Sequence, residues 1–214
     1  MIPLVDRSVY PQAQYPAGQW EYQLFYEESF DAARRGFEAN VRNTVKALFR
    51  KGAPAPRASR LAPRRSATTP AGSGSGSGPD LPRDTDVLTE EDLHRYAAAL
   101  EGNGFFGPDS WYMNSERNLQ FAAQAIDGGK LRMPVLFLHG EYDYTCETVS
   151  SRLADPMRQD CQNLTEVVVQ SGHWMAQEKP LAVNAALAKW LSARIPRAVD
   201  GVTRGDSPAL HTPR

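Results

Sequence analysis

Two polar residues in this 214-residue sequence lie in the turns just after runs that are typical of buried β-strands. Asp143 follows the apolar run PVLFLH at 134–139, and His173 follows LTEVVVQ at 164–170. If these strands are parallel neighbours, both residues lie beyond their carboxyl ends, where functional groups of open α/β sheets collect. A carboxylate beside an imidazole fixes its tautomer and stabilises the imidazolium. The pair is therefore a candidate for two members of a hydrolytic triad, although spacing alone also allows a turn aspartate and a loop-capping histidine.

The number and spacing of the cysteines indicate whether disulfides, a metal site or a cysteine nucleophile are expected. Cys146 and Cys161 are too few for a disulfide framework and suit a reducing compartment, so we expect a cytoplasmic protein. Neither they nor the histidines have the spacing of zinc ligands, so we expect no metal and no cofactor. Cys146 as a nucleophile is an alternative, but the acid-bearing turn around it already explains its surroundings.

The elements around Asp143 and His173 follow a strand–helix–strand–helix order. Apolar residues at steps of four from Val149 to Met157 predict the first helix, and a second is predicted at about 179–194. This order predicts two parallel strands with a right-handed crossover. Two strands are too few for a parallel sheet. Either other strands come from another chain, or the sequence is the C-terminal portion of a larger design.

The first half of the sequence predicts helices. Apolar residues at steps of three and four predict a helix at 27–50, and a shorter helix is predicted at about 112–125. Between them, Thr89 is a good N-cap with Asp92 as its capping-box partner, and GNG at 102–104 ends that helix.

The segment at about 52–85 differs in composition from the rest. It is rich in Pro, Gly, Ser and Arg, contains a GSGSGSG run and has few large apolar residues, so it predicts a disordered loop. Six basic residues without an acid lie between Arg50 and Arg65. An anion-binding arm is one interpretation. We favour a solvated insertion, because no aromatic residues interleave the charges.

Overall charge and hydropathy exclude some partners. A net charge of −1 provides no field that would gather nucleic acid, so we expect no nucleic-acid partner. The apolar runs are too short to span a bilayer, and the N-terminal residues do not have the pattern of a secretory signal.

Five segments carry a resemblance to a known family: EYQLFYEE at 21–28, LTEEDLHRYAAAL at 88–100, GFFGPDSWYMNSERN at 104–118, PVLFLHGEYDY at 134–144 and SGHWMAQEKP at 171–180. The sequence resembles the C-terminal half of the epoxide hydrolases of the α/β-hydrolase superfamily. This implies a truncated α/β-hydrolase fold without the N-terminal half of its core. Residues 1–130 would form a helical cap, residues 131–196 the end of the core, and residues 197–214 a disordered tail.

The resemblance also implies a mechanism on a small-molecule epoxide. A carboxylate opens the ring to form an alkyl-enzyme ester, while cap tyrosines, here Tyr22 and Tyr112, stabilise the alkoxide. A phenol suits this role because it donates a strong hydrogen bond while neutral. His173, held by Asp143, then activates water to release a vicinal diol.

Two tryptophans are further candidates for the site, and the two tyrosines have an alternative interpretation. Trp111 and Trp174, which adjoin Tyr112 and His173 in the sequence, are expected to contact the substrate. Without the resemblance, Tyr22 and Tyr112 would be read as packing residues.

One part of the family pattern does not occur in these 214 residues. No G-x-D-x-G, G-x-S-x-G or HGxP motif is present, so we expect little or no epoxide opening by the chain alone. Alternatives are another α/β-hydrolase, such as a haloalkane dehalogenase or an esterase, and a non-catalytic interaction protein. The latter would use an exposed sheet edge, which is prone to self-association.

Overall fold

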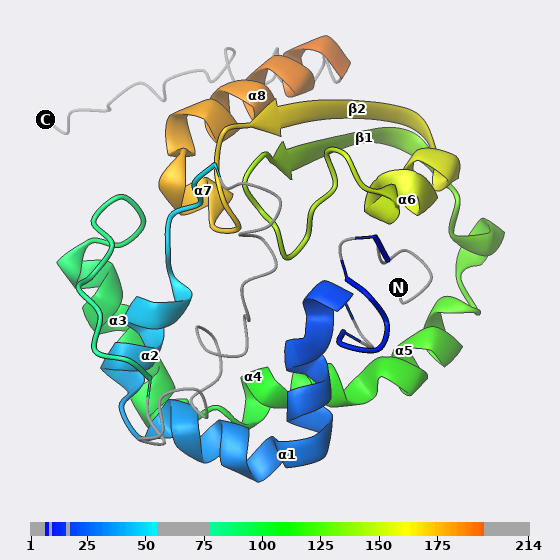
Figure 1. The fold of residues 1–214 in the computed structure, drawn as a ribbon. Coiled ribbons are helices and arrows are strands. Elements are labelled where there is room, and N and C mark those ends of the chain that lie inside the picture. The colour runs from blue at the N-terminus through cyan, green and yellow to red at the C-terminus, as the bar shows by residue number, and fades with distance from the viewer. Residues whose placement is uncertain (1–6, 9, 16–17, 55–77, 195–214) are drawn as a thin grey trace, which may run out of the picture.

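The structure is a computed structural model, and it describes residues 7–8, 10–15, 18–54 and 78–194. Most of the loop predicted at 52–85 and the whole tail predicted at 197–214 lie outside the described residues. Within the described part, no helix combines the length and the apolar character that crossing a membrane requires. Helices dominate the first half of the chain, and a small sheet with its own helices forms the second (Figure 1).

Two helices occupy the segment where the sequence predicts one. A 3₁₀ turn, η2 (Gly18–Trp20), leads into α1 (Glu21–Glu38), and α2 spans Val41–Leu48. The prediction of one helix at 27–50 is wrong because Asn40 leaves helical geometry (φ −152°). Its side-chain oxygen accepts a hydrogen bond from the backbone N–H of Asn43 at 2.9 Å. This cap starts a second helix.

The next helix, α3 (Glu90–Asn103), confirms the predicted N-terminus. Thr89 and Asp92 form a complete capping box, and Gly104, with φ +69°, ends the helix. Where the sequence predicts one helix at 112–125, the structure has η5 (Trp111–Asn114) and α5 (Ser115–Ala122). Helix α4 (Phe106–Ser110) precedes them and η6 (Ile126–Gly129) follows. The 3₁₀ turn η5 matters because it brings Tyr112 against the aromatic side chains of α1.

A compact apolar core joins α1, α2 and α3. Its buried members include Ala33, Phe37, Val45, Leu88 and Leu93. This core fixes α1, and through it Tyr22, relative to the end of α2.

The predicted parallel strand pair is confirmed. Strand β1 (Leu131–Gly140) pairs with β2 (Cys161–Val169), in a register that runs from Val135↔Leu164 to Gly140↔Val169. Between them lie η7 (Arg152–Ala154) and α6 (Asp155–Asp160). The helix predicted from Val149 therefore starts later than expected, where Ser151 accepts a hydrogen bond from the N–H of Leu153 at 3.2 Å.

Helix α8 (Pro180–Arg194), preceded by α7 (Met175–Glu178), lies along the two strands (Figure 1). Apolar side chains of these elements face solvent: Met133 is 58%, Val168 52% and Leu181 85% exposed. A sheet of two strands among the described residues, with exposed apolar positions, fits part of a larger α/β fold.

The end of the predicted disordered loop is held against α2 and the residues that follow it, which corrects that prediction for residues 78–85. Lys46 pairs with Asp80 at 2.6 Å, and Lys51 pairs with Asp86 at 2.6 Å. Arg50 donates to the carbonyl of Pro82 at 2.7 Å. Two of the six basic residues, Arg50 and Lys51, are thus bound to neighbouring groups of the chain itself.

The capping box at Thr89 gives a test of this fold. Replacement of Thr89 by Ala removes the acceptor for the backbone N–H of Asp92, and we expect a loss of about 1 kcal/mol in the free energy of unfolding. Urea unfolding followed by circular dichroism measures it. Thr89→Ser keeps the hydroxyl and should keep most of the stability, and equal losses in both variants would contradict the cap.

Candidate active site

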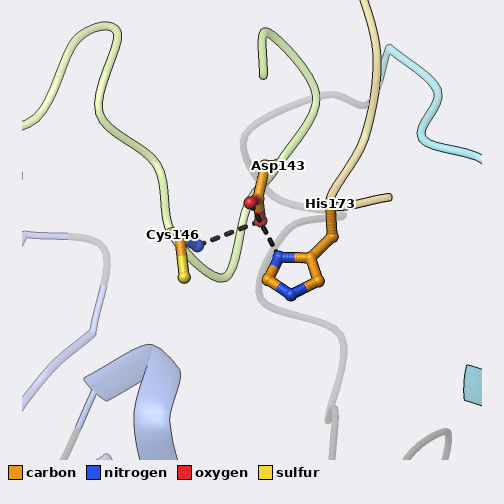
Figure 2. Close-up of side chains that lie close together, drawn as sticks. All are labelled: Asp143, Cys146 and His173. Carbon is orange, nitrogen blue, oxygen red and sulfur yellow. Dashed lines mark hydrogen bonds and ion pairs between the residues drawn. The ribbon is translucent and has the colours of Figure 1, made fainter. Parts of the chain in front are cut away.

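The strand pairing brings Asp143 and His173 together. Each lies in the loop after its strand, and Nδ1 of His173 is 2.8 Å from Oδ2 of Asp143 (Figure 2). The other carboxylate oxygen, Oδ1, accepts hydrogen bonds from the backbone N–H groups of Thr145 (3.1 Å) and Cys146 (3.0 Å). Both oxygens of Asp143 are therefore engaged, and its orientation toward the imidazole is fixed.

This contact sets the charges of the pair. Burial raises the pKa of Asp143, but the hydrogen bond from His173 and the backbone N–H of Cys146 outweigh burial, so the pKa is lowered overall. The hydrogen bond to Asp143, followed by one to Cys146, raises the pKa of His173 from 6.5 to about 10. At neutral pH the pair is thus a carboxylate and an imidazolium, and His173 can act as a base only after losing that proton.

Tyr22 of α1 and Tyr112 of η5 form an edge-to-face pair, with ring centroids 5.5 Å apart and planes at 87°. Nε2 of Gln23 donates a hydrogen bond to the Tyr22 hydroxyl at 3.3 Å. Burial raises the pKa of Tyr22 to about 12 and also raises the pKa of Tyr112. Both phenols therefore remain neutral hydrogen-bond donors over the physiological pH range.

The two pairs line the same cavity, which has a volume of about 610 Å³. Tyr22 and Tyr112 reach it from the helices, and Asp143 and His173 reach it from the loops after β1 and β2. A cavity of this size lies in the range of small-molecule sites. The arrangement therefore places hydrogen-bond donors and an acid–histidine pair around one ligand-sized space.

The two tryptophans of the sequence prediction lie in different places. Trp174 lines the cavity, donates from Nε1 to the carbonyl of Leu48 at 2.7 Å and stacks on Phe49 with ring centroids 4.0 Å apart. Trp111 is 76% exposed and is not among the residues that line the cavity. The adjacent position in the 3₁₀ turn points Tyr112 inward, which leaves Trp111 outside.

A contact between two loops, which sequence reasoning missed, holds the histidine loop in place. Gly52, after α2, lies directly against Gly172, the residue before His173. A Cβ atom on Gly52 would lie 2.3 Å from the Cα of Gly172. The buried Glu178 carboxylate accepts hydrogen bonds from both backbone N–H groups, at 3.1 Å from Gly52 and 2.8 Å from Gly172.

Sequence reasoning did not assign Asp109 of α4 to the site. Its side chain lines the cavity and is 2% exposed, and its Oδ2 atom has no hydrogen-bond partner among the described residues. Burial, with a smaller contribution from the nearby charge of Glu38, raises its pKa from 3.8 to about 7. The sequence signal that could have identified Asp109 is an acidic residue next to aromatic residues in the segment GPDSWY at 107–112.

His139 of β1 has a structural role, as a residue at a strand end. It is buried, with Nδ1 at 2.8 Å from the Thr148 hydroxyl and Nε2 at 3.0 Å from Glu166. These contacts join the loop after β1 to β2 and are separate from the cavity.

The close contact of Gly52 with Gly172 is testable by adding one methyl group. Gly52→Ala forces backbone against backbone, and we expect it to lower the free energy of unfolding by about 1–3 kcal/mol. Gly102→Ala is the matched control, because its Cβ would meet nothing within 4 Å and Ala favours helix α3. Urea unfolding that ranks the two variants equally would contradict the contact.

Asp109 should make stability depend on pH. The folded state keeps a proton that the unfolded chain releases, so its contribution to stability falls as pH rises from about 4 to about 7. Asp109→Asn removes this titration. In urea unfolding, the stability of the variant relative to the wild type should therefore be greater at pH 8 than at pH 5. The same difference at both pH values would show that Asp109 titrates normally.

Comparisons with known proteins agree with the resemblance seen in the sequence. No family model matches the chain. The chain is 30% identical over 181 residues to bifunctional epoxide hydrolase 2 of Rattus norvegicus, a match that covers 82% of this chain and 30% of that protein. It is 32% identical over 107 residues to epoxide hydrolase A of Mycobacterium tuberculosis, covering 49% of this chain and 32% of the relative.

Solved structures give the same result for the fold. The crystal structure of epoxide hydrolase A from Mycobacterium thermoresistibile matches with a TM-score of 0.60 and 26% identity, over 79% of this chain and 51% of the other. The chain spans about a third of the length of the curated relatives it matches. It is thus homologous to epoxide hydrolases over about four-fifths of its own length, and its fold is part of the α/β-hydrolase fold.

Proposed function

We propose that this chain supplies the acid–histidine pair and the phenolic donors of an epoxide hydrolase, which converts an epoxide and water into a vicinal diol. The observation that carries the proposal is that Asp143–His173 and Tyr22–Tyr112 line one cavity. The relatives named epoxide hydrolase give the substrate class, a small-molecule epoxide.

In the ring-opening step, the two phenols bind the epoxide oxygen. The alkoxide that forms when a C–O bond breaks is a poor leaving group, so donors near the oxygen lower the barrier. Tyr22 and Tyr112 are suited to this role, because burial keeps both hydroxyl groups protonated before the reaction. The edge-to-face contact of their rings fixes Tyr22 and Tyr112 relative to each other at the cavity.

In the hydrolytic step, neutral His173 removes a proton from the water that attacks the alkyl ester. Asp143 then stabilises the imidazolium through the 2.8 Å contact with Nδ1. Because the pKa of His173 is about 10, only a small fraction of the resting pair is in the base form at neutral pH. This fraction grows as pH rises, so the rate of ester hydrolysis should rise with it.

The nucleophilic carboxylate must come from elsewhere. The 214 residues contain no nucleophile-elbow motif, and the chain aligns with about a third of its curated relatives. Asp109, the other cavity-lining carboxyl, is a poor nucleophile because its raised pKa keeps it partly protonated at neutral pH. We therefore propose that the chain alone has little or no epoxide-opening activity. Its two free cysteines suit the expected cytoplasmic location.

Two alternatives remain from the sequence. A haloalkane dehalogenase stabilises a halide with Trp or Asn N–H donors, whereas here two tyrosines line the cavity and the Nε1 of Trp174 is bonded to Leu48. A non-catalytic interaction protein is supported by the two-stranded sheet and by exposed side chains such as Met133 and Val168. Self-association through that sheet belongs to this second alternative.

Catalysis can be tested by supplying the nucleophile. The chain would be fused behind the N-terminal half of the epoxide hydrolase core from its mycobacterial relative, and diol formation from styrene oxide would be measured by chromatography. We expect turnover by the fusion, and none above a His173→Ala control by the chain alone. In the fusion, His173→Ala should reduce turnover at least about 100-fold. Tyr22→Phe and Tyr112→Phe should each reduce it by about 10²-fold.

Tyr96→Phe is the matched control, since Tyr96 stacks on Phe49 and does not line the cavity. A folded fusion that remains inactive would favour the interaction protein, and size-exclusion chromatography of the chain alone would then measure its self-association. Turnover that survives His173→Ala would contradict the assigned base.

A further inference from the structure

A third side chain joins the Asp143–His173 pair. The sulfur of Cys146, a carboxylate oxygen of Asp143 and a ring nitrogen of His173 all lie within 4.8 Å of one another. Figure 2 shows the thiol beside the carboxylate and the imidazole, with Cys146 and Asp143 on the same loop and His173 opposite. In the described part of the chain, this is the one group of three such side chains that is compact enough to hold a metal ion.

We propose that Cys146, Asp143 and His173 form a binding site for a divalent cation of the zinc class. Thiolate, imidazole and carboxylate are the three ligand types that zinc uses in proteins, at about 2.3, 2.0 and 2.0 Å. Tetrahedral coordination at these lengths places neighbouring ligand atoms roughly 3.3–3.6 Å apart. The three atoms observed here need to move by only about an ångström to meet that geometry.

The supporting contacts hold the acid in a suitable orientation. The backbone N–H groups of Thr145 and Cys146 bind Oδ1 of Asp143, so Oδ2 alone faces His173. Hydrogen bonds of this kind orient metal ligands and strengthen binding. The ion would take the place of the proton between Oδ2 and the imidazole, and their 2.8 Å separation would widen to admit it.

The open side of the cluster gives the ion access. The Cys146 residue is exposed, and the side chain of His173 is 52% exposed. Three protein ligands leave the fourth coordination position of zinc open to water, as in catalytic zinc sites. Metal binding itself does not depend on the proposed function. If that function holds, an ion on His173 and Asp143 occupies the base and inhibits hydrolysis.

Cobalt(II) titration of the full chain under reducing, chelator-free conditions tests the site. Cobalt coordinated by a thiolate gives a near-ultraviolet charge-transfer band, and tetrahedral coordination gives intense visible bands. We expect both, with one equivalent bound, and their disappearance on addition of zinc, which binds more tightly. The chain has two cysteines, so Cys161→Ser is the matched control for Cys146→Ser.

The charge-transfer band should persist in Cys161→Ser and disappear in Cys146→Ser. Asp143→Asn and His173→Ala should each weaken zinc binding at least about tenfold, measured by calorimetry on variants whose circular dichroism matches the wild type. No band at stoichiometric cobalt, a band that survives Cys146→Ser, or one lost in Cys161→Ser would each overturn the site. These readouts require no catalysis, so they fail independently of the epoxide hydrolase proposal.

Discussion

The parallel pairing of β1 with β2 is the constraint on which the candidate site depends. With Gly140 opposite Val169, the loops that follow both strands start at the same edge of the sheet, so Asp143 and His173 meet. A shift of one residue would turn every side chain of one strand to the other face and separate the loop tips. The Asp143–His173 pair and the proposed cation site thus both depend on this register.

Short sequence patterns predicted the elements that are determined by interactions between residues close together in the chain. The capping box at Thr89 and the parallel order of the two strands follow from short-range patterns, and the structure confirms both. The break at Asn40 was not predictable from apolar spacing, because the spacing continues through it. Only the side-chain bond of Asn40 to the N–H of Asn43 shows that the residue caps a helix rather than lying within one.

The residues of the candidate site also fall into those that the sequence could identify and those that it could not. Asp143 and His173 could be placed from strand ends, and the tyrosines from the resemblance, since motif positions carry that information. Glu178 could not be found, because its role arises from Gly52 and Gly172, which are 120 positions apart in the sequence and meet only in the fold. Cys146 could not be identified as a candidate metal ligand for a related reason: spacing along the chain does not show that its sulfur lies within 4.8 Å of the Asp143 and His173 ligand atoms.

The buried carboxyl of Asp109 has a consequence for what the cavity accepts. An acid that gains charge near pH 7 adds one negative charge to the cavity lining as the solution turns from mildly acidic to alkaline. Arg50, Lys51, Asp143 and His173 line the same cavity, so the charge on Asp109 shifts an existing balance of charges against anionic ligands and acts far less on uncharged molecules. The electrostatic environment that a ligand meets in the cavity therefore depends on pH, and it becomes less favourable to anions as the medium becomes more basic.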